Sequence, residues 1–506
     1  MNSIVLTTLN SRFSHTSIGL RYLYANMQDL QEITHIQEYS INDNVQSIAE
    51  GILDSSPDIL GIGVYIWNAT QVHELITIIK NVSPKTVIVL GGPEASYTPF
   101  RVDFSKADFI LQGEGDVAFY NLCKEVQNNA APTEQIIRPV MADLSKIARP
   151  YVYYTDDDIA NRYIYVEASR GCPFLCEFCL SSIDEKVRNF ELDTLLEDFE
   201  MLWQKGVRNY KFIDRTFNLN MRFANKILDF FLSKEPPYFA HFEVIPDHFP
   251  DSIKEKIAKF PAGSLQLEVG IQTLNLEIAE GINRPLKLNK IRENINFLEN
   301  DTKAHMHLDL LVGLPGESLE SFGKNLNELT SMTDAEIQIG ILKKLSGTTL
   351  SRHDEIHGMV YSNIPPYDIL QNNNLEFKEI QKMKRFSRFW DLTYNSGNFV
   401  LVMPLLFQDD VFKNFYAFSE WIYTQTASTW KISLDRLAKL LYEYLTQVHH
   451  LNAEETALLM VRDFTKIEGR KLPVFLRAYE RAQIRLSQQV EGTGGQNKRQ
   501  ARHESG

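Results

Sequence analysis

The chain alternates short apolar runs with segments of helical periodicity, and this alternation restricts the folds that it can adopt. About five such units fill the first 126 residues. Their strand-like runs are Ile4 to Leu9, Ile33 to Tyr39, Ile59 to Trp67, Thr86 to Leu90 and Asp108 to Leu111. Between the runs, apolar residues recur at i, i+3, i+4 and i+7. Repeated βα units predict a parallel, doubly wound α/β sheet of the flavodoxin or Rossmann type, with helices on both faces.

The loops after these runs are rich in small and polar residues. They comprise Asn10 to Ser17, Gly91-Gly92-Pro93-Glu94 and Gly113-Glu114-Gly115. Ligands of doubly wound sheets bind outside the carboxyl ends of the strands, where such loops gather. The N-terminal unit is therefore expected to bind a ligand at this edge of its sheet.

A second series of βα units begins near residue 163. Its strand-like runs are Tyr163 to Ser169, Tyr210 to Ile213, Phe239 to Val244, Leu265 to Ile271, His305 to Val312 and Glu336 to Leu342. Six parallel strands with amphipathic helices between them predict a partial (β/α)6 barrel. Active sites of such barrels lie at the carboxyl ends of the strands.

Composition and periodicity divide the chain into five parts. The N-terminal sheet covers residues 1–130, a proline-containing linker covers 131–162, and the barrel covers 163–350. Long helical segments rich in aromatic residues make up a mainly helical C-terminal domain at 351–486. Residues 487–506 contain almost no apolar side chains, so this tail is expected to be disordered.

The chain has 506 residues, a formal net charge of -13 and four cysteines. So few cysteines exclude a disulfide framework, and the first residues lack the pattern of a secretory signal. The longest apolar stretch near the C-terminus, Phe399 to Phe407, is too short to span a bilayer. We therefore expect a cytoplasmic protein that does not contact membranes. The acidic balance also disfavours broad binding to nucleic-acid phosphates.

Three of the four cysteines lie close together, directly after the first barrel strand. Cys172, Cys176 and Cys179 therefore belong to a loop at the catalytic end of the predicted barrel. Three thiolates fit a [4Fe-4S] cluster that keeps one iron without a protein ligand, because a closed iron-sulfur or zinc site normally takes four ligands. A zinc site completed by a distant histidine is the alternative.

The spacing CxxxCxΦC, with Phe178 as the aromatic residue Φ, resembles the hallmark of the radical S-adenosylmethionine (SAM) superfamily. The resemblance covers residues 163–350 and implies that SAM chelates the open iron and is cleaved reductively to a 5'-deoxyadenosyl radical. A small-molecule substrate and a low-potential electron donor of the flavodoxin or ferredoxin type are implied as partners. Phe178 would pack near the adenine of SAM, or would serve as an ordinary core aromatic residue.

Other strand ends resemble the SAM-binding segments of this superfamily. Asp214 and Arg215, after the second strand, would contact the SAM amino group, or would form an ion pair with each other. Glu268 and Gln272, on the fourth strand, would contact the ribose and carboxylate, because a charged residue in a core strand needs a partner. Gly313, after the fifth strand, resembles the glycine that approaches the adenine.

A doubly wound domain ahead of such a barrel resembles the cobalamin-binding group of the superfamily. The resemblance implies cobalamin contacts at Ser11, Tyr65, Asn68, Gly91, Gly92, Pro93, Glu94, Gly113, Glu114 and Gly115. Cobalamin domains that ligate cobalt through histidine carry DxHxxG in their first loop. Around His15 this chain has Phe13 in place of the aspartate and Ile18 in place of the glycine. We therefore predict a bound cobalamin without a protein histidine on cobalt.

The shortage of cysteines narrows the chemistry that the resemblance implies. Outside the trio only Cys123 remains, and its helical spacing with Phe119 and Leu122 predicts a small buried hydrophobic residue. Methylthiotransferases, maturases with auxiliary clusters and methylases that use a methylated cysteine all need further cysteines. Methyl transfer to an unactivated carbon or a phosphinate is the favoured reaction. Cobalamin-dependent radical cyclisation, rearrangement or oxidation is the alternative.

Two other classes of function are compatible with parts of the sequence. The segment Lys382 to Trp390 interleaves basic and aromatic residues, which would suit an RNA-modifying or RNA-binding protein. The same pattern fits an amphipathic helix whose aromatic side chains pack inward, and we favour that interpretation, so nucleic acid is not expected as a partner. A cobalamin-binding sensor with a vestigial barrel is the other class, and the intact cysteine trio argues against it.

Overall fold

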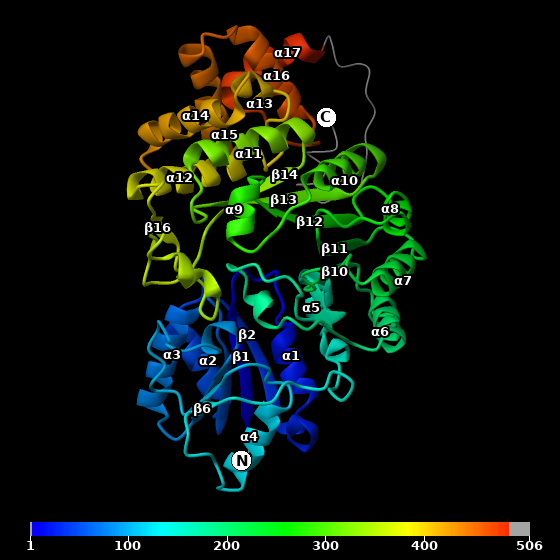
Figure 1. Ribbon diagram of the computed structural model, residues 1–506, viewed down its shortest axis with the longest axis vertical. Coiled ribbons are helices and arrows are strands. Elements are labelled where there is room, and N and C mark those ends of the chain that lie inside the picture. The colour runs from blue at the N-terminus through cyan, green and yellow to red at the C-terminus, as the bar shows by residue number, and fades with distance from the viewer. Residues whose placement is uncertain (1–2, 485–506) are drawn as a thin grey trace.

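The structure is a computed structural model that describes residues 3–484. Figure 1 shows an N-terminal α/β unit, an open barrel and a helical C-terminal region arranged along the long axis of the molecule. No helix within the described residues is long and apolar enough to cross a membrane. The tail that is predicted to be disordered, residues 487–506, lies outside this range.

The first sheet has six parallel strands in the order β2-β1-β3-β4-β5-β6. Its strands are β1 (Ile4–Asn10), β2 (Thr34–Ser40), β3 (Ile59–Gly63), β4 (Val87–Gly91), β5 (Phe109–Leu111) and β6 (Ile136–Ile137). The predicted run Ile59 to Trp67 stops being a strand at Gly63. The side chain of Asn68 accepts a hydrogen bond from the Tyr65 amide at 2.8 Å, which turns the chain into the next helix.

Helices cover both faces of this sheet. They are α1 (Ile18–Ala25), α2 (Val45–Asp54), α3 (Ala69–Val82) and α4 (Ala118–Gln127). Ile48 of α2 and Ile76 of α3 belong to one hydrophobic core, whereas Leu20 of α1 and Phe119 of α4 belong to a second core on the opposite face. The prediction of a doubly wound N-terminal unit is therefore confirmed.

The segment 131–162 carries more structure than a linker would need. Its residues Ile136 and Ile137 pair with β5 and add the sixth strand, β6, to the first sheet. It then forms α5 (Asp156–Asn161), which begins with a capping box between Thr155 and Asp158. The domain boundaries at 130, 162, 350 and 486 stay a prediction.

The second sheet is the partial barrel of six strands that the sequence predicts. Its order is β14-β13-β12-β11-β10-β7, all parallel. The strands are β7 (Ile164–Val166), β10 (Asn209–Phe212), β11 (Phe239–Val244), β12 (Leu265–Gln272), β13 (His305–Val312) and β14 (Glu336–Ile341). The outer helices are α6 (Leu192–Gln204), α7 (Met221–Leu232), α8 (Asp251–Ile257), α9 (Leu276–Gly281), α10 (Leu288–Asp301) and α11 (Leu319–Met332).

Burial alternates along the barrel strands and gives the sheet two different faces. On β12, Leu265, Leu267 and Val269 are fully buried and belong to the core, whereas Gln266 and Glu268 between them are half-buried. Because successive side chains of a strand point to opposite faces, the second set lies on the other, inner face. The inner face of the barrel is therefore polar.

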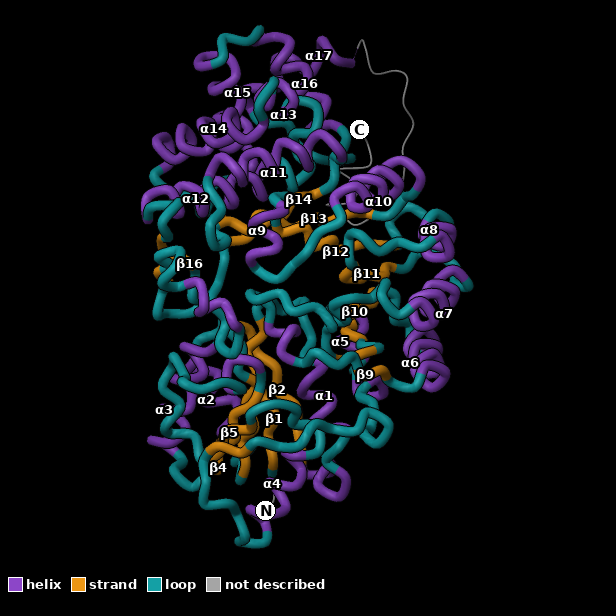
Figure 2. Tube along the Cα trace, viewed as in Figure 1, coloured by secondary structure: helices purple, strands orange, loops and turns teal. Residues whose placement is uncertain are grey.

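The C-terminal region is mainly helical, as predicted, and Figure 2 shows its helices beyond the barrel. A short antiparallel pair, β15 (Val360–Tyr361) and β16 (Ile369–Gln371), precedes the helices α12 (Phe377–Thr393), α13 (Met403–Phe407), α14 (Val411–Thr426), α15 (Leu434–Glu443), α16 (Ala453–Thr465) and α17 (Arg477–Ile484). Trp390 is fully buried in the same hydrophobic core as the barrel. The Asn395 side chain also bonds both backbone groups of Ile337 at 3.0 Å, so this region packs on the edge strand β14.

The basic and aromatic segment lies within α12 and has the structure of an amphipathic helix. Met383 and Phe386 are fully buried. Lys384 forms an ion pair with Asp368 at 2.7 Å, and Arg385 forms one with Glu420 at 2.8 Å. These cations are neutralised within the protein, which favours the helix-packing interpretation over RNA binding.

Candidate functional site

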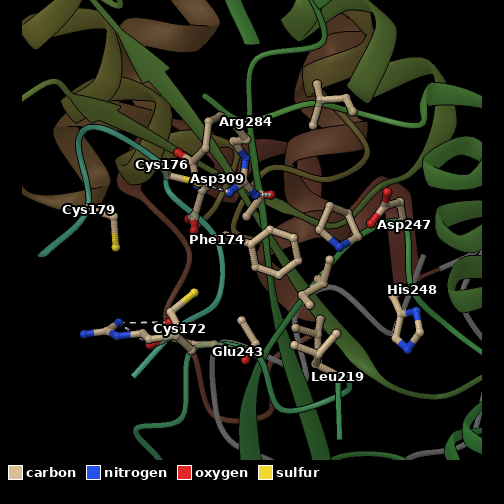
Figure 3. A pocket seen from close by; sticks show the side chains of 18 of the residues that line it. Cys172, Phe174, Cys176, Cys179, Leu219, Glu243, Asp247, His248, Arg284 and Asp309 are labelled. Atoms are coloured by element: carbon tan, nitrogen blue, oxygen red, sulfur yellow. Dashed lines mark hydrogen bonds and ion pairs between the residues drawn. The ribbon is translucent and has the colours of Figure 1, made fainter. Parts of the chain in front are cut away.

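A cavity of about 510 Å³ opens at the carboxyl ends of the barrel strands. Figure 3 shows Cys172, Cys176 and Cys179 on one side of it and His248 on the other. All three cysteines line the cavity, and the described residues around it place no histidine beside them as a fourth ligand. This donor set fits a [4Fe-4S] cluster whose open iron faces a ligand in the cavity, and it does not fit a closed zinc site.

Backbone geometry fixes the cysteine loop. The loop is closed at its base by the antiparallel strands β8 (Ser169–Arg170) and β9 (Arg188–Asn189). Gly171 has a φ of +90°, and a Cβ atom there would lie 2.6 Å from the carbonyl oxygen of Lys186. The Cys172 amide donates to the Asp184 carbonyl at 2.9 Å. Glycine is therefore required where the chain enters the loop.

Arg284 connects the cysteine loop to the barrel, and it belongs to no motif that identifies it from the sequence. Its Nη1 donates to the Cys176 sulfur at 3.3 Å, and its Nη2 donates to the Gly270 carbonyl on β12. Hydrogen bonds to cluster sulfurs are one of the means by which proteins set a cluster's potential. Arg284 and Cys176 are 108 residues apart in the sequence, so this contact becomes visible only in the folded structure.

An ion pair and a histidine–carboxylate hydrogen bond lie on the inner barrel face beside the cavity. Arg215 pairs with Glu243 at 2.7 Å, whose negative charge raises the arginine pKa, and not with Asp214. Glu268 accepts a hydrogen bond from His241 at 3.0 Å. Burial raises the pKa of Glu268, but this hydrogen bond and the positive charges nearby lower it overall. Arg215 and Glu268 both line the cavity, and their contact with SAM stays a prediction.

Asp309 is a further cavity residue that the sequence did not single out. It lies on β13, and its Oδ1 is buried without a hydrogen-bond partner among the described residues. Burial and the nearby charges of Glu268 and Glu243 raise its pKa well above the usual range. A carboxyl group that readily keeps its proton can both donate to and accept from a ligand.

The remaining predicted SAM contacts divide into two groups. Phe178 and Gln272 line the cavity. Asp214 does not, because its carboxylate accepts from the Ala168 amide at 2.9 Å and from the Ser169 hydroxyl at 2.5 Å. Gly313 also lies elsewhere: a Cβ atom there would approach the side chain of Ile369 in β16 to 2.7 Å. The Asp214 carboxylate therefore joins the segment after β7 to the segment after β10. Contact of Asp214 or Gly313 with SAM stays a prediction.

Glu317 follows the Gly313 turn and is buried. Its Oε1 accepts hydrogen bonds from Thr273 and Asn325 at 2.8 Å each, and burial raises its pKa to about 7. In the folded chain this carboxyl keeps its proton up to a higher pH than in the unfolded chain. The folded state then binds more protons, so stability falls as the pH rises from about 4.5 to about 7.

Glu317→Gln is therefore expected to reduce the fall in the free energy of unfolding that accompanies a rise in pH. Because glutamine does not ionise, the variant should gain up to about 3 kcal/mol relative to the natural chain between about pH 5 and about pH 8. Urea unfolding at both pH values measures the difference. Glu320→Gln, at an exposed position nearby, is the matched control, and equal pH slopes for the two variants would contradict the expectation.

A second cavity, of about 350 Å³, lies between the first sheet and the barrel. Its N-terminal wall contains seven glycines: Gly19, Gly61, Gly63, Gly91, Gly92, Gly113 and Gly115. A Cβ atom on Gly113 would meet nothing within 4 Å, so the strand ends leave open space here. Glu167, Arg170 and Ile213 of the barrel close the other side. A largely apolar slot beneath glycine loops suits one face of a large flat ring, and it would hold part of a cofactor such as cobalamin.

Six of the predicted cobalamin contacts line this cavity: Tyr65, Gly91, Gly92, Gly113, Glu114 and Gly115. Ser11, Asn68, Pro93 and Glu94 do not line it. The Asn68 amide donates to the Leu9 carbonyl at 3.1 Å, and Glu94 accepts a hydrogen bond from Tyr367 of the C-terminal region. His15 also lies outside the lining and bonds the Tyr165 hydroxyl at 2.5 Å.

Family models match three parts of the chain. A B12 binding domain matches residues 4–123, the Radical SAM superfamily matches residues 166–329, and a protein of unknown function (DUF4080) matches residues 355–500. The first two matches fall on the two α/β units that contain the cavities. They confirm the prediction of a [4Fe-4S] cluster, SAM and cobalamin as cofactors.

Known proteins resemble the chain over most of its length. An uncharacterized methyltransferase of Pyrococcus horikoshii is 22% identical over 407 residues, which are 73% of this chain and 86% of that protein. The cobalamin-dependent radical SAM methyltransferase TokK of Streptomyces tokunonensis is 23% identical over 59% of this chain, and the chain spans only 49% of TokK.

Among solved structures, the cobalamin-dependent SAM radical enzyme OxsB with aqua-cobalamin and SAM bound has a TM-score of 0.59. The match is 12% identical and covers 100% of this chain and 83% of that chain, so it supports the fold alone. The cysteine loop at the barrel mouth, the glycine-lined cavity and the matching domain models agree with one another. The chain therefore belongs to the radical SAM proteins that carry an N-terminal B12-binding domain.

Proposed function

We propose that this enzyme transfers a methyl group to an unactivated carbon or a phosphinate centre of a small molecule. The observation that carries the proposal is the pair of cavities on one chain, one lined by the three cysteines and one by the glycine loops. Relatives named as methyltransferases, including TokK, support the choice of reaction. When bound, the cluster and SAM supply a radical that removes hydrogen from the substrate, and cobalamin supplies the methyl group.

The chain's own residues position the reactants and exclude water. Arg284 holds the Cys176 sulfur against β12, and Arg215 with Glu243 forms one wall of the cavity. Asp309 offers a buried carboxyl to a ligand at the same mouth. Phe174 and Phe178 add apolar surface on the cysteine side, which keeps solvent away from the reacting atoms.

The fourth cysteine supports this choice of chemistry. Cys123 is fully buried in α4, and burial raises the pKa of its thiol to about 12. A thiol in such a place is inert as a nucleophile or methyl acceptor. Methylation routes that need an additional reactive cysteine therefore lack one among the described residues.

Incubation with SAM that carries a deuterated methyl group tests the proposal. The anaerobic holoenzyme, with a low-potential reductant and a candidate substrate, should give a mass-shifted methylated product together with 5'-deoxyadenosine and S-adenosylhomocysteine. S-adenosylhomocysteine must form because each transferred methyl group leaves it behind. Sustained turnover that yields 5'-deoxyadenosine alone would refute methyl transfer and indicate a cyclisation, rearrangement or oxidation.

The electron donor, the cellular compartment and the cofactor contacts are part of the same proposal. The electron donor is a flavodoxin or ferredoxin, and the protein works in the cytoplasm, where its thiolates stay reduced. SAM contacts Phe178, Arg215, Glu268 and Gln272 of the first cavity. Cobalamin contacts Tyr65, Glu114 and the glycine loops of the second cavity, with no histidine of the chain on cobalt.

A further inference from the structure

A second group of metal-binding side chains lies at the opposite end of the barrel from the cysteines. His305 and His307 lie at the start of β13, and Glu336 is the first residue of β14. The cysteine loop follows the carboxyl end of a strand, whereas these residues mark the amino ends of parallel strands. None of the three lines the cysteine cavity. They are therefore separate from the radical site.

Strand register brings these three side chains onto one face. His305 and His307 are two residues apart on β13, so they point to the same side of the sheet. His307 stands opposite Glu336 in the parallel pairing of β13 with β14. The pairing of two adjacent strands thus brings one carboxylate and two imidazoles together, without a contribution from any loop.

The distances between the donor atoms suit a metal ion. Nε2 of His305 is 3.2 Å from one oxygen of Glu336, and Nε2 of His307 is 2.5 Å from the other. All three donor atoms lie within 4.8 Å of one another. Ligands of a tetrahedral zinc ion are about 3.4 Å apart, given bonds of about 2.0–2.2 Å. Small rotations of the side chains, which shift the donor atoms by about 1 Å, would bring them to that spacing.

Burial and access also favour an ion. The side chain of Glu336 is 1% exposed and that of His305 is 7% exposed, so their donor atoms are largely shielded from water. Beside them lies a surface cavity of about 430 Å³, to which His305, Glu299 and Asp334 contribute. The lining carries these two acidic residues against one cation, Lys303, and this negative balance would attract a metal ion.

We propose that His305, His307 and Glu336 form a zinc site. Two imidazoles and one carboxylate are a donor set that zinc takes in proteins, and imidazole favours zinc over magnesium or calcium. The ion would join β13 to the edge strand β14, where the open barrel ends. Its role is to stabilise this edge and not to take part in the radical reaction. A trio held by hydrogen bonds without metal is the competing interpretation.

Metal analysis and X-ray absorption of the anaerobically purified full-length protein test the proposal. Growth in zinc-supplemented medium should give about one zinc per chain, in addition to iron and cobalt. At the zinc edge, the nearest neighbours should be nitrogen and oxygen at about 2.0–2.2 Å. Sulfur neighbours at about 2.3 Å would place zinc in the cysteine loop and overturn the proposal. Substoichiometric zinc, below about a tenth per chain, would also overturn it.

Variants separate the metal site from the hydrogen-bonded trio. His307→Gln and Glu336→Gln keep side chains that can form hydrogen bonds, and both should lose zinc while they retain iron. His35→Ala, at an exposed histidine of the N-terminal sheet, is the matched control and should keep zinc. Retention of zinc by both glutamine variants would contradict the assignment. The spectrum of the natural chain decides the question even if a variant fails to fold.

Discussion

Cys176→Ser is expected to abolish reductive cleavage of SAM. Cys176 lines the cavity and receives the Arg284 hydrogen bond, so its loss removes a cluster ligand and the partner of that guanidinium together. The loss should exceed the roughly 10–100-fold that removal of an outer partner of a metal ligand costs. Formation of 5'-deoxyadenosine by the reduced, reconstituted protein measures the effect, and the iron content should fall in parallel.

The remaining cysteine provides a matched control. Cys123→Ser introduces the same chemical change in α4, remote from the cavity. It should cost some stability because it places a hydroxyl in a core, but it should leave iron content and SAM cleavage close to those of the natural chain. Normal cleavage activity in Cys176→Ser would show that the three-cysteine loop does not hold the cluster.

Gly171→Ala is the second change with a large expected effect. The new methyl group would lie 2.6 Å from the Lys186 carbonyl and 2.8 Å from the Asp184 carbonyl, both backbone atoms that cannot turn aside. The loop must shift, and Cys172 is the next residue along the chain. A displacement of about 1 Å at a reacting centre can lower the rate by about 100-fold. We expect lower iron content and a loss of SAM cleavage of that order.

Gly206→Ala separates the steric clash from backbone strain. Gly206 follows α6 with a φ of +95°, close to the +90° of Gly171, but a Cβ atom there meets nothing within 4 Å. This control should therefore cost only the conformational penalty of about 1–2 kcal/mol that an L-residue incurs at positive φ. Iron content and SAM cleavage are measured in both variants. Equal losses in the two would refute the steric explanation.

The sequence predicts the fold well because local periodicity encodes it. Eleven strand-like runs correspond to strands of the two sheets, as the alternation of apolar runs and helical segments indicates. It misses β6, whose two residues are too short to show a pattern and become a strand only by pairing with β5. Short edge strands depend on tertiary contacts that no local window contains.

The sequence predicts some residues of the candidate site and misses others. The cysteines lie close together in the sequence, so their spacing identifies the loop. Arg284 and Asp309 escape notice because they acquire a role only when β12, β13 and the cysteine loop meet in space. Asp214 and Gly313 stand where the family pattern suggests ligand contacts, yet neither lines the cavity, and the Asp214 carboxylate accepts hydrogen bonds from the chain itself. A motif identifies the position of a residue but not the direction of its side chain.

Arg170 contacts both α/β units at once. Its guanidinium holds Asp116 of the N-terminal unit at 2.9 Å and Glu167 of the barrel at 2.8 Å, and it lies two residues before Cys172. Any rotation of one unit against the other would have to break these largely buried ion pairs, which is costly. Together with the Arg188–Glu114 ion pair, Arg170 thus ties the strands at the base of the cysteine loop to the glycine loop that lines the second cavity, so these pairs help to set the spacing of the two cavities.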